Sequence, residues 1–149
     1  MVENELEETI KQLQKKIERD EEQTYSKTVI REYRNPTYFG VLKQPDAAGI
    51  LKGPCGDTMK MFLKIRAGKI KDAWFWTDGC GATLASGNML MKMVKGKSLQ
   101  EANIITDAKL IEALETLPSE HHHCALLAVN TLHKTILDYQ KWGGKHGGL

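Results

Sequence analysis

Long apolar runs are missing from this 149-residue chain, and so is any large excess of one charge. No stretch reaches the roughly 18 consecutive apolar residues that a membrane-spanning helix needs, so we expect no membrane insertion. The 21 basic and 19 acidic residues nearly cancel, which gives no electrostatic reason to expect binding to nucleic acid. The first residues, Met1-Val2-Glu3-Asn4-Glu5, are acidic and polar, unlike a secretory signal, so we expect a cytoplasmic protein.

Cysteine is scarce as well: the chain has three, an odd number that does not fit a framework of disulfides. In a reducing compartment, three thiols fit metal or thiol chemistry better. Glycines flank Cys80 directly and lie within two residues of Cys55 on both sides, so the backbone can approach a bound group closely. Asp57 lies near the first cysteine, and His123 directly precedes Cys124. Three soft sulfur ligands with one oxygen or nitrogen ligand nearby suit zinc or an iron–sulfur cluster.

Each of these residues also has a purely structural explanation. A free cysteine is commonly a small buried hydrophobe, and Asp57 can simply close a turn. For His121 and His122 we expect a solvated helix start. A catalytic pair of His123 and Cys124 is disfavoured, because neighbours in sequence on a helix point to different faces. No loop suited to an oxyanion or a nucleotide accompanies these residues, which argues against an acyl- or phosphoryl-transfer enzyme.

Composition divides the chain into three parts. Residues 1–23 are strongly charged, lack glycine and proline, and carry a narrow apolar seam, which predicts a helical arm. The seam consists of Leu6, Ile10, Leu13 and Ile17. Two heptads are too few to predict a coiled coil, so only weak self-association through the arm is left open. Residues 24–142 form the domain proper, and the glycine-rich residues 143–149 are expected to be a flexible tail.

Alternating and helical patterns predict the elements of this domain. A helix is expected over 24–34, and two alternating strands, joined by a tight turn, over 58–66 and 69–77. Further helices are expected over 81–94, from Lys97 or Ser98, over 107–117, and over 122–139. Cys80 then stands at the start of one helix and Cys124 in the first turn of another. Unpaired amides and the helix dipole are expected to lower the pKa of a thiol at both places.

Five motifs occur in order between about Tyr25 and Tyr139. They are Asn35-Pro36, Gly53-Pro54-Cys55-Gly56-Asp57-Thr58-Met59, Thr77-Asp78-Gly79-Cys80-Gly81-Ala82, Val94-Lys95-Gly96-Lys97-Ser98-Leu99, and Leu117-Pro118 through His123-Cys124. Together they resemble the U-type iron–sulfur cluster scaffold family, the IscU-like proteins that include the amino-terminal domain of NifU. The combination of Cys-Gly-Asp, Gly-Cys-Gly and His-Cys makes this resemblance specific.

The resemblance implies an α+β fold, with a small antiparallel β-sheet of about three strands covered on one side by helices. It implies that Cys55, Cys80 and Cys124 hold a transient 2Fe–2S cluster built from iron and sulfur, with Asp57 or His123 as the fourth ligand. It also implies zinc at the same site in the apo form. A fourth ligand other than thiolate would let the cluster leave, because iron in such clusters prefers thiolate.

The family further implies a cysteine desulfurase as sulfur donor, acceptor apo-proteins that receive the cluster, and a scaffold rather than an enzyme. One alternative is a zinc-bound sulfur acceptor that relays persulfide sulfur, although the interval from Cys80 to Cys124 lacks the insertion that marks that SufU branch. Another is a zinc-stabilised interaction module. Members served by a dedicated Hsp70-type chaperone carry Leu-Pro-Pro-Val-Lys before the His-Cys pair. Here that motif has diverged to Leu117-Pro118-Ser119-Glu120-His121.

Two tryptophans stand out for their place on a predicted strand. Trp74 and Trp76 share the strand face opposite Phe75. We expect the N-terminal arm to fold over them as part of an ordinary core. The alternative is an exposed aromatic patch used for self-association or for docking a partner.

Overall fold

The computed structural model describes residues 2–142, so the predicted tail at 143–149 lies outside the described residues. The elements in chain order are α1 (Val2–Thr24), α2 (Lys27–Arg34), β1 (Ala47–Lys52), β2 (Thr58–Arg66), β3 (Lys69–Thr77), α3 (Gly81–Val94), α4 (Leu99–Asn103), α5 (Asp107–Ala113), the 3₁₀ turn η1 (Ser119–His121) and α6 (His122–Trp142). The two hairpin strands and α3 have the predicted bounds. The prediction of a helix to residue 117 is wrong: Glu115 and Thr116 have φ values of 60° and 98°, which a right-handed helix cannot contain.

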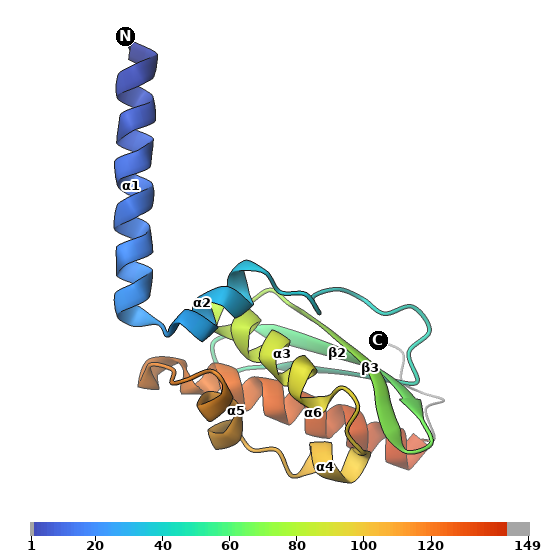
Figure 1. Cartoon of the computed structure of the whole chain (residues 1–149). Coiled ribbons are helices and arrows are strands. Elements are labelled where there is room, and N and C mark those ends of the chain that lie inside the picture. The colour runs from blue at the N-terminus through green and yellow to red at the C-terminus, as the bar shows by residue number, and fades with distance from the viewer. Residues whose placement is uncertain (1, 143–149) are drawn as a thin grey trace.

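A three-stranded antiparallel sheet, in the order β1-β2-β3, forms one layer of the domain. Helices α3 and α6 form a second layer against one face of it (Figure 1). Side chains on a strand alternate between faces, and Met59, Met61 and Phe75 point to the helical face, where they are fully buried. The predicted α+β fold, with a small antiparallel sheet covered on one side by helices, is confirmed.

Helix α3 approaches the sheet closely at Gly87. A Cβ added at this position would lie 2.5 Å from the ring of Phe75, far inside van der Waals contact. The helix can therefore pack on β3 only because residue 87 has no side chain. This contact fixes the position of α3, whose first residues carry part of the candidate site.

A buried carboxylate joins α2 to α3. Glu32 is only 1% exposed, and its two oxygens accept hydrogen bonds from Asn88 Nδ2 and Lys92 Nζ, both at 2.8 Å. Asn88 Oδ1 in turn accepts a bond from the backbone amide of Tyr38. Burial opposes the charge on Glu32, yet the hydrogen bonds from Lys92, Asn88 and Arg31 outweigh it and lower the pKa of this carboxyl. The network therefore anchors α2 and the segment after it onto the domain.

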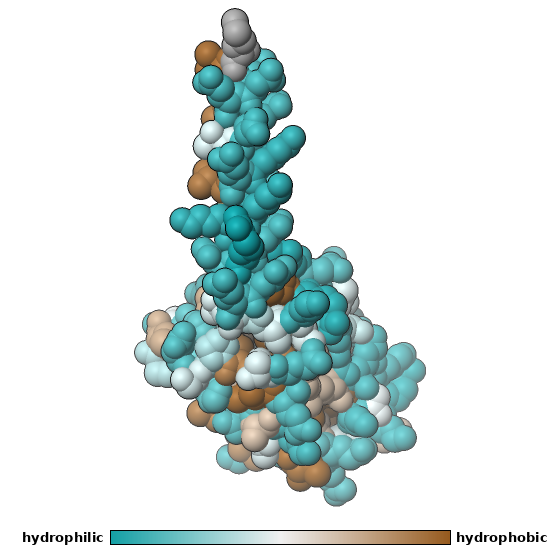
Figure 2. Space-filling view, turned by 60° about the vertical axis from the view of Figure 1, so that its left-hand side comes forward, coloured by the Kyte–Doolittle hydropathy of each residue, from teal (hydrophilic) through white to brown (hydrophobic). Residues whose placement is uncertain are grey.

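Helix α1 projects away from the domain (Figure 1). None of its residues is buried, and its seam residues are 45–60% exposed: Leu6, Ile10, Leu13 and Ile17. Figure 2 shows apolar patches along one side of this otherwise hydrophilic helix. Its base is joined to α2 by an ion pair between Glu21 and Arg34 at 2.6 Å. None of the described helices is both long enough and apolar enough to span a bilayer.

The expectation that the arm covers the two tryptophans is wrong. Instead, the segment after α2 runs along the edge of β3, where the amide of Gly40 donates to the carbonyl of Phe75. Tyr38 in this segment packs edge-to-face on Trp74, with ring centroids 6.0 Å apart. Trp76 lies under the ammonium group of Lys60, 5.2 Å from the ring centroid. Both tryptophans are half-buried by these neighbours while the arm points elsewhere.

Candidate metal centre

The loops before β2 and after β3 meet at one end of the sheet. Met59 pairs with Thr77 in the antiparallel register, so the chain enters β2 beside the point where it leaves β3. Asp78 Oδ1 accepts a hydrogen bond from the amide of Thr58 at 2.8 Å, which ties the two loops together. Cys55 lies in the first loop and Cys80 ends the second. Residues 25 positions apart in sequence are thereby brought to the same end of the domain.

A tight turn presents Cys55 to solvent. The amide of Gly56 donates to the carbonyl of Gly53 at 3.0 Å, and Gly53 donates to the carbonyl of Asp57 at 2.7 Å. Gly56 has a φ of +87°, a conformation that residues with a Cβ rarely adopt. The turn leaves Cys55 exposed and directs Asp57 toward α3.

Cys80 is the N-cap residue of α3, as the sequence predicts for a helix start. Thr83, one turn into the helix, has its hydroxyl 3.7 Å from Sγ of Cys80, and the same hydroxyl donates to Asp57 Oδ2 at 3.0 Å. Gly79 makes room for this arrangement, since a Cβ there would lie 2.7 Å from that carboxylate oxygen. Asp57 and Cys80 therefore flank one threonine.

His123 stands between the other two cysteines. Its Nε2 lies 3.2 Å from Sγ of Cys55 and 3.6 Å from Sγ of Cys124. Cys124 belongs to the first turn of α6, as predicted, and is buried. The structure thus brings all five sequence-predicted site residues to one end of the domain, in two neighbouring groups: Cys55, His123 and Cys124 in one, Asp57 and Cys80 in the other.

His121 also lies in this cluster, contrary to the expectation that it is solvated. Cys80, His121 and Cys124 each place one potential ligand atom within 4.8 Å of the other two. Among residues 2–142, this is the one group of three Cys, His, Asp or Glu side chains close enough to hold a metal ion by that criterion. His121 is half-buried, and Tyr25 packs against its ring with centroids 5.7 Å apart. His122 is exposed, as expected, and its Nε2 lies 2.8 Å from the carbonyl of Leu117.

The two helix-start thiols differ in acidity. Burial opposes ionisation of Cys80, but hydrogen bonds from the backbone amides of Thr83 and Ala82 lower the pKa of its thiol. Burial dominates at Cys124 and raises the pKa of its thiol to about 11, with the nearby Cys80 adding to the rise. The expectation that the helix start lowers the pKa of both thiols is therefore wrong for Cys124. A bound cation would favour the thiolate form of both.

Sequence reasoning missed Thr83, Tyr25 and the position of His121. Thr83 has a local signal, since it follows the N-cap residue by three positions, where side chains meet in the first helical turn. Tyr25 and His121 have none, because they lie 96 positions apart and meet only in the folded chain, where Ser26 also bonds the carbonyl of Leu114. Soft sulfur with imidazole and one carboxylate is a donor set suited to zinc or iron.

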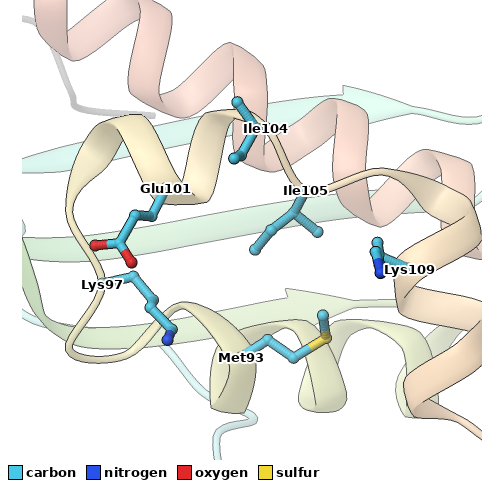
Figure 3. A pocket seen from close by; sticks show the side chains of 6 residues that line it. All are labelled: Met93, Lys97, Glu101, Ile104, Ile105 and Lys109. Atoms are coloured by element: carbon cyan, nitrogen blue, oxygen red, sulfur yellow. The ribbon is translucent and has the colours of Figure 1, made fainter.

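A separate groove lies at the other end of α3. It has a volume of about 510 Å³ and is lined by Met93, Lys97, Glu101, Ile104, Ile105 and Lys109 (Figure 3). Cys80 caps the opposite end of this 14-residue helix, roughly 20 Å away at 1.5 Å per residue. The side chains that line the groove include no thiol and no imidazole, unlike those at the cysteine end.

Comparisons with known proteins agree with this geometry. The model of the NifU-like N-terminal domain family matches residues 24–145. The chain is 38% identical over 122 residues to the iron-sulfur cluster assembly scaffold protein IscU 1 of Archaeoglobus fulgidus, covering 81% of this chain and 80% of that protein. It is 40% identical over 121 residues to IscU of Escherichia coli, covering 78% of this chain and 94% of that protein.

Solved structures agree on the fold. The crystal structure of a NifU-like protein (N-terminal) from Brucella abortus superposes with a TM-score of 0.65 at 20% identity, over 78% of this chain and 94% of that one. A putative scaffold protein for the SUF system from Fervidobacterium islandicum gives a TM-score of 0.64, also at 20% identity, over 75% of this chain and 96% of that one. The family match, the identity to relatives and the shared fold lead to one conclusion: this chain belongs to the U-type iron–sulfur cluster scaffold family, the IscU-like proteins with a NifU-like N-terminal domain.

Proposed function

We propose that this protein is a non-catalytic scaffold on which a 2Fe–2S cluster is assembled and from which the cluster passes to acceptor apo-proteins. Two of its relatives are named iron-sulfur cluster assembly scaffold proteins. The observation that carries the proposal is the meeting of three thiols at one end of the domain, two of them exposed at the surface. Thiolates are the preferred ligands of iron in such clusters, and exposure gives donor and acceptor proteins access.

In this proposal Cys55, Cys80 and Cys124 are the firm ligands, and Asp57 or His123 completes the set. His123 Nε2 already lies within 3.6 Å of two of the sulfurs, whereas the Asp57 carboxylate is held by Thr83. Carboxylate and imidazole bind iron less firmly than thiolate does. A site with three strong ligands and one weak ligand is therefore suited to releasing its cluster.

The sulfur donor in this proposal is a cysteine desulfurase, and zinc occupies the site in the apo form. A reducing compartment such as the cytoplasm would keep the three thiols free, in agreement with their unpaired state. The chaperone motif before the His-Cys pair has diverged, so we expect handover without the dedicated Hsp70-type partner.

We also propose that the arm joins two copies of the protein through its exposed seam. If Ile10 of one copy faces Leu13 of an antiparallel second copy, Glu7 lies opposite Lys16, so charges of opposite sign meet. Apart from Val2 and the seam, every residue of α1 is polar or charged, and Figure 2 shows the apolar patches on one side of the helix. The half-buried Trp74 and Trp76 are the second candidate surface for association.

The main test is anaerobic reconstitution with ferrous iron, a cysteine desulfurase with cysteine, and a dithiol reductant, so that the sulfur arrives at the persulfide level and can either form a cluster or stay on a thiol. The parent protein is expected to develop visible charge-transfer absorption and to pass its cluster to an apo-ferredoxin. Replacing any one of Cys55, Cys80 or Cys124 by alanine should abolish or strongly reduce this absorption, whereas His122→Gln at an exposed neighbouring position should not.

The same experiment separates the alternatives. A persulfide on one thiol with zinc retained, and no cluster absorption, would indicate a zinc-bound sulfur acceptor instead. If the protein forms neither a cluster nor a persulfide, and still needs zinc for its stability, the result would indicate an interaction module. Either result would refute the scaffold proposal.

A further inference from the structure

The two nitrogens of His121 have different surroundings. Nε2 lies 3.2 Å from the hydroxyl oxygen of Tyr25. Nδ1 is buried and has no hydrogen-bond partner among the described residues. A buried polar atom without a partner is uncommon, and each one calls for an explanation such as an absent ion. The surroundings of His121 supply one, because one of its ring nitrogens lies within 4.8 Å of the sulfurs of Cys80 and Cys124, and Nε2 already has Tyr25 as its partner.

The tautomer of His121 decides what Nδ1 can do. If the Nε2–H group donates to the Tyr25 oxygen, Nδ1 carries a free lone pair, which is the form of imidazole that binds a metal ion. The opposite arrangement would leave a buried N–H group without an acceptor. A metal-bound histidine usually donates its other N–H to a fixed neighbour, and Tyr25 is placed to be that neighbour.

Tyr25 is itself held in place. Its amide donates to the carbonyl of Glu21 at 2.7 Å, and its ring meets that of Tyr33 edge-to-face at 5.9 Å. Tyr33 packs directly over the backbone of Gly81, next to Cys80. The rings of Tyr25 and Tyr33 therefore pack against each other between the base of α1 and the thiols.

We propose that His121 is a metal ligand in this protein, binding a zinc or ferrous ion through Nδ1 together with the sulfurs of Cys80 and Cys124, and that Tyr25 is its positioning residue. This proposal rests on the proposed function only in that Cys80 and Cys124 serve as ligands in both. It adds a mononuclear ion site that shares Cys124 with the group of Cys55 and His123. His121 and His123 thus both lie near the shared thiol, with their ring centroids 6.4 Å apart.

Anaerobic titration of the apo-protein with Co²⁺ tests this inference without any cluster chemistry. Cobalt reports its ligands through its absorption bands. His121→Gln is expected to weaken Co²⁺ binding by more than about tenfold and to shift the bands, and Tyr25→Phe to weaken it by about tenfold with the bands retained. His122→Gln, the matched control, should match the parent. Unchanged binding by His121→Gln would overturn the proposal, and tighter binding by Tyr25→Phe would mean that the tyrosine competes for the ligand nitrogen and would overturn it as well.

A second measurement does not depend on any variant. Long-range ¹H–¹⁵N NMR of the apo-protein is expected to show His121 with its proton on Nε2, and a proton on Nδ1 would overturn the proposal. Cluster reconstitution on His121→Gln separates the two ideas. If His121→Gln binds Co²⁺ normally and also assembles the cluster normally, only the His121 site is refuted. If Co²⁺ binding requires His121 but the parent protein assembles no cluster, only the scaffold proposal is refuted.

Discussion

The Thr83 hydroxyl lies between Asp57 and Cys80, donating to the Asp57 carboxylate at 3.0 Å and sitting 3.7 Å from the cysteine sulfur. One side chain in the first turn of α3 therefore positions two candidate ligands that come from different loops. A carboxylate held by a hydroxyl group is also partly withdrawn from metal binding. This makes Asp57 the candidate ligand that is easiest to displace.

The first prediction concerns the lifetime of the cluster. Asp57→Ala is expected to slow cluster loss several-fold, because the remaining nitrogen ligand, His123, suits iron better than a carboxylate does. The decay of visible absorbance after reconstitution measures this lifetime. Asp138→Ala, on the far part of α6, is the control. Equal decay rates in Asp57→Ala and the parent would show that this carboxylate does not make the cluster labile.

The second prediction follows from the acidity of the thiols. Thiolate is the reactive form, so the lowered pKa of Cys80 should make it react with iodoacetamide in the apo-protein at neutral pH. Cys124, with a pKa of about 11, should react at least about tenfold more slowly at pH 7.5, and its rate should keep rising as the pH increases toward 11. Mass spectrometry of each peptide measures both rates. In urea the difference should disappear; equal rates in the folded protein would contradict the prediction.

The third prediction concerns the buried carboxylate of α2. Glu32→Ala is expected to lower the free energy of unfolding by about 2–3 kcal/mol, since Asn88 is fully buried and loses its acceptor. Because the folded-state pKa of Glu32 is lowered, its contribution is present above pH 4.5 and is lost as the pH falls below that value. Urea unfolding at two pH values measures both effects. Glu112→Ala, in an exposed pair with Lys109, should change the midpoint little.

The fourth prediction concerns the contact between α3 and the sheet. An alanine in a helix normally stabilises it by about 1 kcal/mol relative to glycine. At Gly87 the sign should reverse, because the new Cβ would lie 2.5 Å from the Phe75 ring. We expect Gly87→Ala to destabilise the domain by about 1–3 kcal/mol in thermal or urea unfolding. A more stable variant would mean that α3 can move away from β3 at little cost.

The fifth prediction concerns the arm. Leu13→Lys introduces a charge into the exposed seam and is expected to shift the protein toward the monomer at concentrations where the parent associates. Gln12→Lys adds the same charge beside the seam and should have a smaller effect. Light scattering over a concentration series measures the mass. A parent that is monomeric throughout, or a Leu13→Lys protein of unchanged mass, would refute association through α1.

Local patterns in the sequence were enough to predict most elements. The alternation in 58–66 and 69–77 and the helical spacing in 81–94 reproduce β2, β3 and α3, because neighbours in the chain decide these structures. The positive φ values at Glu115 and Thr116 were not predictable, since neither residue favours this conformation. There the chain bends where Ser26 bonds the carbonyl of Leu114, a contact between distant segments.

The sequence by itself determined the chemistry: three free cysteines beside an aspartate and a histidine, with glycines where the backbone must turn sharply or pack closely. Tertiary structure alone decided how these groups meet. It buries Cys124 and so raises the pKa of its thiol. It also places His121 beside the sulfurs of Cys80 and Cys124, with the Tyr25 hydroxyl 3.2 Å from Nε2 of His121. The burial of Cys124 and the contact between Tyr25 and His121, which are 96 positions apart, both depend on how the helices pack. The spacing of residues along the chain does not encode that packing.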